Sequence, residues 1–222
     1  MSVDKDLLKT LIVEYGRLLA KENYTWSLSI CSNPFEDLVF IALTSTGMGD
    51  VFAFRDYFTL KFLARNSKKK LSEYILNNVE KLCQELKIEK RVVKETLVGL
   101  ARLSQKYRLE EVSWRDMGVA LKNVDANKFV EDLAKIYKFR AKEGEILPFA
   151  ISQLCRVWGL QPPKDLELSR NTKEVLRKLG LSENDFKKQD YPYIDLAAFF
   201  LRILTKKIEE KLDIRMIKLV FI

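Results

Sequence analysis

The chain has 222 residues, 47% of them hydrophobic and 32% charged, which is enough for one large domain or two small lobes with a common core. Its formal charge of +8 favours a polyanionic partner, with nucleic acid ahead of an anionic membrane, although solubility alone also accounts for a basic surplus. Because the chain contains no histidine, the usual general base and triad partner are excluded, and catalysis must rest on Lys, Asp, Glu, Tyr or Cys.

Helical periodicity dominates the first half of the chain. Apolar residues recur at helical spacing from Asp4 to Ala20, and Asn33 and Pro34 suit the cap and first position of a second helix. A third helix, rich in aromatic residues, is expected over residues 50–64. Two more amphipathic helices are predicted after a basic connector, over residues 71–86 and 89–107.

The second half continues in the same way. The pattern predicts short pieces over residues 112–127, then helices over residues 128–142, 147–158, 172–179 and about 195–212, and an apolar tail over residues 214–222. Gly159 and Gly180 are expected to end two of these helices. There is no strand–helix alternation, hairpin series, repeat or linker in the pattern. We therefore expect an all-α fold: a single compact domain over residues 1–222, built as two interleaved lobes with a central cleft.

The cysteines and the apolar segments limit the cellular setting. Cys31, Cys83 and Cys155 form no CxxC pair and have no histidine to join, so free thiols are expected rather than a zinc site. No stretch reaches the ~18 uninterrupted apolar residues of a membrane span, and the N-terminus lacks a signal-peptide core. We expect a cytoplasmic protein with no membrane partner and no metal or organic cofactor.

Lys128 begins a predicted helix and shares one stripe with Asp132 and Lys135, opposite the apolar face. One interpretation is a solvated face with i,i+4 and i,i+3 ion pairs. The other places the stripe in a cleft, with Lys128 as a nucleophile. An amine that is neutral, partly removed from water and close to a second positive charge can attack an electrophilic sugar carbon.

Asp165 follows a rigid Pro162-Pro163 turn and precedes a helix. An aspartate in such a place is commonly a helix cap or a first-turn acid. The alternative is a catalytic carboxylate, which would stabilise the positive charge that develops on a sugar.

Asp195, Phe199 and Arg202 lie on one line of the last long helix, whose other residues there are apolar. A carboxylate and an aromatic ring one turn apart suit a flipped base, through hydrogen bonds to its edge and stacking on its face. An Asp–Arg pair that closes the end of a buried helix is the alternative. Phe54 is likewise either a core residue or a residue that stacks on a ligand.

In combination, these segments resemble the archaeal 8-oxoguanine DNA glycosylase family (AGOG), a divergent branch of the helix-hairpin-helix glycosylase superfamily. The motifs keep their order over roughly residues 35–205: a Thr- and Gly-rich turn at residues 44–50 before an aromatic helix, Lys128 with Lys135 seven residues later, Asp165 followed by Arg170, and Asp195 with Phe199. Phe54 and Phe199 stand where the family commonly has tryptophan. A second register of the proline-rich segment would place Leu168 at the position of the aspartate.

The resemblance implies a bifunctional enzyme of base excision repair, an N-glycosylase and AP lyase that acts as a monomer on damaged DNA in the cytoplasm, at the nucleoid. Lys128 would form a Schiff base with the sugar and Asp165 would stabilise the transition state. The implied substrate-binding residues are Phe54, Lys135, Asp195 and Phe199. Two alternatives remain: a non-catalytic, basic, helical nucleic-acid-binding protein, and a helical scaffold whose charge serves solubility.

Overall fold

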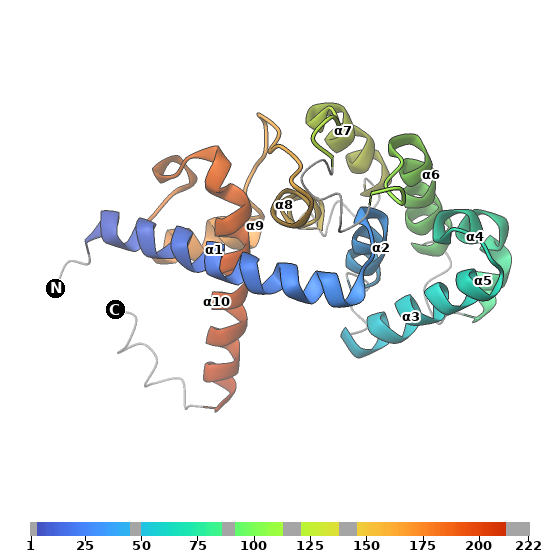
Figure 1. Cartoon of the computed structure of the whole chain (residues 1–222). Coiled ribbons are helices and arrows are strands. Elements are labelled where there is room, and N and C mark those ends of the chain that lie inside the picture. Colours follow the sequence, from blue (N-terminus) through green and yellow to red (C-terminus); the bar gives the residue numbers. More distant parts are fainter. Residues whose placement is uncertain (1–3, 45–49, 86–91, 113–120, 138–145, 212–222) are drawn as a thin grey trace.

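A computed structural model of the protein describes residues 4–44, 50–85, 92–112, 121–137 and 146–211. Over these residues the fold is helical and contains no strand, which confirms the all-α prediction (Figure 1). The α-helices are α1 (Lys5–Ile30), α2 (Pro34–Thr44), α3 (Asp50–Asn66), α4 (Leu71–Asn77), α5 (Val79–Glu85), α6 (Val98–Tyr107), α7 (Ala126–Tyr137), α8 (Ile146–Trp158), α9 (Arg170–Lys178) and α10 (Tyr191–Lys211).

The junction between α1 and α2 forms as the sequence predicts. Asn33 caps α2, because its Oδ1 accepts a hydrogen bond of 3.0 Å from the backbone N–H of Glu36, and Pro34 is the first helical residue. Helix α1 is longer than expected and continues from Ala20 to Ile30. Its N-terminal turns lie partly outside the core, since Leu7 and Leu11 are each 56% exposed.

The predicted helices over residues 71–86 and 89–107 are each divided. Asn78 ends α4: its backbone N–H donates to the Ile75 carbonyl and its side-chain amide to the Tyr74 carbonyl at 2.8 Å, so α5 starts anew. A π-helical turn, η1 (Val92–Leu97), precedes α6. An asparagine that bonds the backbone of the preceding turn offers an alternative to continued helix, which the apolar periodicity does not reveal.

Helices α8 and α9 are each followed by a glycine with a positive φ angle. Gly159 follows α8 with φ 68° and Gly180 follows α9 with φ 71°, both in the left-handed region that other residues avoid. Two 3-10 turns, η4 (Glu183–Asp185) and η5 (Lys188–Asp190), lead into α10, which begins at Tyr191 rather than near Asp195. The predicted apolar tail over residues 214–222 lies outside the described residues.

One contiguous apolar core joins most of the helices. Its buried side chains run from Ile12 on α1 to Ala197 on α10, and Trp158 is the largest that is fully enclosed. Helix α10 packs against α1, α8 and α9, while α2 packs against α3, α6 and α8 (Figure 1). In the described residues, no helix is long and apolar enough to cross a membrane. The division into two lobes with a cleft stays a prediction.

Candidate functional site

Lys128 lies in the first turn of α7. Asp125 caps this helix, because its Oδ1 accepts the backbone N–H groups of Asn127 (3.1 Å) and Lys128 (3.2 Å). Helix α7 therefore starts at Ala126, two residues earlier than predicted. The Lys128 side chain is exposed, so burial does not supply the removal from water that the sequence argument assumed. Bound substrate would have to supply it.

The rest of the Lys128 stripe forms a small charged cluster around Asp132. This carboxylate accepts hydrogen bonds from the ammonium groups of Lys106 and Lys135 (3.0 Å for Lys135) and from the hydroxyl of Tyr107 (2.9 Å). Hydrogen bonds from the two lysines, and then from Tyr107, lower the pKa of Asp132 below its usual range. Burial, followed by the bond to Asp132, raises the pKa of Tyr107 to about 12.

This cluster tests the ion pairs expected along α7. The i,i+3 pair between Asp132 and Lys135 forms, whereas Lys106 on α6, instead of Lys128, provides the second partner. Much of the positive charge of Lys135 is therefore offset by Asp132. Lys106 and Tyr107 contact Asp132 across 26 and 25 positions of sequence, so the periodicity of one helix could not reveal them.

Asp165 is exposed in the turn between α8 and α9, where the backbone N–H of Leu166 bonds to the Pro163 carbonyl at 3.1 Å. It does not cap α9. The cap is Ser169, whose Oγ accepts the backbone N–H of Thr172 at 3.2 Å. The capping interpretation of Asp165 is therefore wrong, and its carboxylate is available to a ligand.

Asp195 is 3% exposed and takes part in the fold itself. Its Oδ2 accepts the hydroxyl of Ser152 on α8 (2.9 Å), and its Oδ1 accepts the backbone N–H of Ser169 at the start of α9 (3.1 Å). Burial raises its pKa; hydrogen bonds from Thr172, Ser169 and Ser152 and the charge of Arg156 oppose that rise. Binding of a base edge by Asp195 stays a prediction, and the base would have to reach a carboxylate that already joins three helices.

The two predicted stacking residues lie in different surroundings. Phe199 is 45% exposed on α10, with its ring edge-on to Phe200 at 5.6 Å between centroids. Phe54 on α3 is half-buried and packs against Phe40 (5.0 Å) and Phe58 (6.3 Å). The side chain of Arg202 lies outside the described part of the structure, so the alternative Asp–Arg pair is not tested.

The structure brings only some of the predicted site residues together. Lys128 and Lys135 share α7, and the turn that contains Asp165 leads directly to Ser169 and so to Asp195. Neither a hydrogen bond nor an ion pair within the described residues links Lys128 to Asp165 or to Asp195. Figure 1 shows α3 at the lower right and α7 at the top, so Phe54 and Lys128 come from separated helices.

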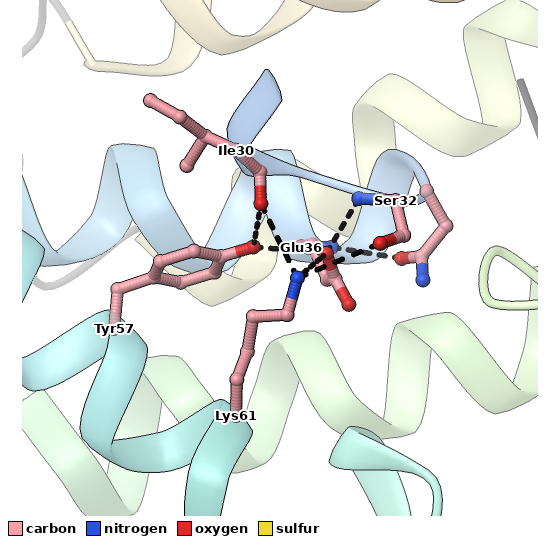
Figure 2. Close-up of polar contacts among 6 residues, drawn as sticks. Ile30, Ser32, Glu36, Tyr57 and Lys61 are labelled. Atoms are coloured by element: carbon pink, nitrogen blue, oxygen red, sulfur yellow. Dashed lines mark hydrogen bonds and ion pairs between the residues drawn. The ribbon is translucent and has the colours of Figure 1, made fainter. Parts of the chain in front are cut away.

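A second polar cluster, which the sequence argument missed, ties α1, α2 and α3 together (Figure 2). The Oε2 atom of Glu36 accepts hydrogen bonds from the backbone N–H of Ser32 (2.5 Å), the hydroxyl of Tyr57 (2.8 Å) and the ammonium of Lys61 (2.9 Å). The single hydroxyl proton of Tyr57 is shared between Glu36 and the Ile30 carbonyl at the end of α1, and Lys61 donates to the same carbonyl. Lys61 donates to the Ile30 carbonyl, the Ser32 hydroxyl and the Glu36 carboxylate, so the cluster joins the end of α1 to α2 and α3.

A buried carboxylate lies beside this cluster. Asp37 accepts the indole N–H of Trp158, and burial raises its pKa to about 6, against hydrogen bonds from Cys31 and Trp158 that lower it. Burial, together with Asp37, raises the pKa of the Cys31 thiol, so this cysteine is an inert thiol rather than a nucleophile. In the described residues, no group of three or more acidic or cysteine side chains is arranged to hold a metal ion.

No family model, curated protein or solved structure matches the chain. The resemblance to the archaeal glycosylase family therefore rests on the order and spacing of the motifs alone.

Proposed function

We propose that the protein is a DNA N-glycosylase and AP lyase that removes oxidised guanine through a covalent intermediate on Lys128. The observation that carries this proposal is the position of Lys128: an exposed amine in the first turn of α7, held by the Asp125 cap at the start of the helix that follows α6 and its connection. A nucleophile on a capped helix has a fixed backbone, so the point from which its side chain reaches toward a sugar is set before binding.

The chemistry follows from the groups available. The neutral amine of Lys128 attacks C1′ of the damaged nucleotide, and the glycosidic bond breaks with its electron pair on the departing base. The carboxylate of Asp165, exposed in its turn, stabilises the positive charge that develops on the sugar. The nitrogen then loses a proton to water, the sugar ring opens to an imine, and β-elimination breaks the strand on the 3′ side. Basic residues on the surface hold the phosphates without reading sequence.

The test is borohydride trapping on a duplex that contains 8-oxoguanine. Wild-type protein should form a covalent adduct, and the Lys128→Gln variant should form none while it binds the same duplex with nearly unchanged affinity. Lys122→Gln is the matched control, since it removes one exposed lysine six positions earlier and should trap like the wild type. Wild-type trapping by Lys128→Gln would mean that the nucleophile is another residue.

A non-catalytic nucleic-acid-binding protein is the second candidate, and one observation favours it: both oxygens of Asp195 are used inside the fold. Such a protein would bind DNA with a marked salt dependence, with log K falling by about 0.9 per phosphate contact for each unit of log salt. It would give no adduct with any lesion. A scaffold protein would show neither adduct nor salt-dependent binding.

A further inference from the structure

The exposed face of α3 combines aromatic rings with unbalanced positive charge. Phe58 is 48% exposed and Phe62 is 63% exposed, whereas the aliphatic residues Leu60 and Ala64 of the same helix are buried. Phe54, Phe58 and Phe62 are spaced by four residues, so they follow one another along the helix at intervals of about 6 Å. We call this row the α3 aromatic ridge.

Two rings of the ridge are stacked, and one of them is supported by a buried ring. Phe54 and Phe58 are nearly parallel, with an interplanar angle of 14° and 6.3 Å between centroids. The edge of Phe58 is supported by Tyr57, whose ring lies 5.3 Å away at 65°. A buried neighbour that fixes the orientation of an exposed ring lowers the entropy lost when a ligand stacks on it.

Basic residues beside the ridge are partly paired, and two of them are left over. Between Phe54 and Lys70 the chain carries six basic residues and one acidic residue, Asp56, while Lys61, Lys69 and Lys70 are paired with Glu36, Glu73 and Glu111 from other segments. The carboxylate of Asp56 is paired with Arg55 at 2.6 Å. Arg65 and Lys68 are exposed and have no acidic partner among the described residues. Arg65 and Lys68 beside exposed rings therefore suit an anion that also has flat, apolar faces.

We infer that the α3 aromatic ridge, with Arg65 and Lys68, is a binding surface for unpaired bases of a single-stranded nucleic acid. Bases of any sequence stack on exposed aromatic rings, while cations beside the rings contact the phosphates. A membrane surface also attracts exposed phenylalanine and basic residues, but the outward residues here are aromatic and the aliphatic ones point inward, which favours stacking. The surface lies apart from Lys128, because α3 is at the lower right and α7 at the top of the view (Figure 1).

Two substitutions at Phe62 separate stacking from simple hydrophobic contact. Titrations of a fluorescently labelled oligothymidylate, followed by anisotropy, should show that Phe62→Ala weakens binding about 5- to 150-fold. Phe62→Leu should weaken it by a similar factor, since it keeps apolar area and loses the flat ring. Arg65→Gln should reduce the salt slope of binding by about 0.7, the value for one phosphate of a single strand.

The controls use equally exposed side chains elsewhere. Leu11→Ala removes a 56% exposed apolar residue from α1 and should leave binding unchanged, and circular dichroism should confirm that each variant is folded. Lys122→Gln, which removes an exposed lysine outside the ridge, should bind the oligonucleotide like the wild type. Borohydride trapping and oligonucleotide binding are separate assays, so a failure of trapping leaves the result for the ridge independent. Wild-type affinity in both Phe62 variants would overturn the inference. The inference would also be overturned if the wild-type protein bound phosphatidylserine vesicles but not the oligonucleotide. A dimer that the Phe62→Ala substitution dissociates would overturn it as well.

Discussion

Gly16→Ala is expected to destabilise the protein even though alanine is the better helix former. Gly16 lies inside α1, where the substitution alone should stabilise the helix by about 1 kcal/mol. A β-carbon at this position, however, would lie 2.6 Å from the carbonyl carbon of Tyr193 on α10 and closer still to its oxygen. These are backbone atoms, which cannot rotate away, so the two helices must separate around the contact of Leu19 and Ala20 with Leu196.

Overpacking of this kind costs about 1–3 kcal/mol in a well-packed core, and the obstacle here is rigid, so the upper part of that range applies. With the gain in propensity subtracted, we expect a net loss of about 2 kcal/mol. For a chain of this length that corresponds to a fall in Tm of about 4–8 °C, measurable by thermal and urea unfolding.

Gly99→Ala is the matched control for this prediction. Its β-carbon would meet only the side chain of Ile136, at 3.0 and 3.1 Å, and a side chain can move by a few tenths of an ångström. The propensity gain of about 1 kcal/mol should then nearly offset the crowding, and the stability should change little. If Gly16→Ala is as stable as Gly99→Ala, the close approach of α1 to α10 does not exist in solution and the reasoning fails.

Three further substitutions test individual contacts. Asp37 has a pKa of about 6 in the folded protein against an ordinary value of 3.8, so the folded state binds the proton of Asp37 more tightly than the unfolded state does. The free energy of unfolding therefore falls by roughly 3 kcal/mol as pH rises from about 4 to about 6. Asp37→Asn should remove that part of the slope in urea unfolding between pH 4 and 7, and an unchanged slope would assign it to other groups. Tyr57→Phe removes the hydroxyl that bonds both Glu36 (2.8 Å) and the Ile30 carbonyl (3.0 Å), and should cost about 1–2 kcal/mol in the same measurement, whereas no loss would mean that Lys61 alone holds the junction. Gly180→Ala should cost about 1–2 kcal/mol, because φ is 71° although the space around it is open; unchanged stability would mean that the turn relaxes.

Local rules account for the parts of the fold that the sequence predicted well. Helix caps and positive φ angles depend only on residues close in sequence, so they can be recognised from the sequence. Examples are the Asn33 cap before Pro34, and Gly159 and Gly180. The break at Asn78 depends on whether its side chain bonds the preceding turn, and the apolar spacing of residues 71–86 is the same in either case.

The candidate site was harder to predict because its contacts are distant in sequence. Ser169 and Ser152, which donate hydrogen bonds to Asp195, lie 26 and 43 positions away. A polar residue on an apolar helix indicates that its side chain is buried with a hydrogen-bond partner, but it does not identify that partner. Exposure of a side chain also depends on the tertiary fold. A lysine at the start of an amphipathic helix can face a cleft or solvent with the same sequence pattern, and Lys128 is exposed to solvent.

The carboxylate of Asp195 also sets a limit on kinetics. Because Asp195 is 3% exposed and is held between three helices, a ligand reaches its carboxylate only when the surrounding structure opens, and the opening rate becomes a ceiling on the rate of recognition. Exchange of the Ser169 amide hydrogen with deuterium reports the same opening event, because a bonded, buried N–H exchanges only when it is released. A glycosylase that read its base with Asp195 would therefore turn over no faster than this buried region opens.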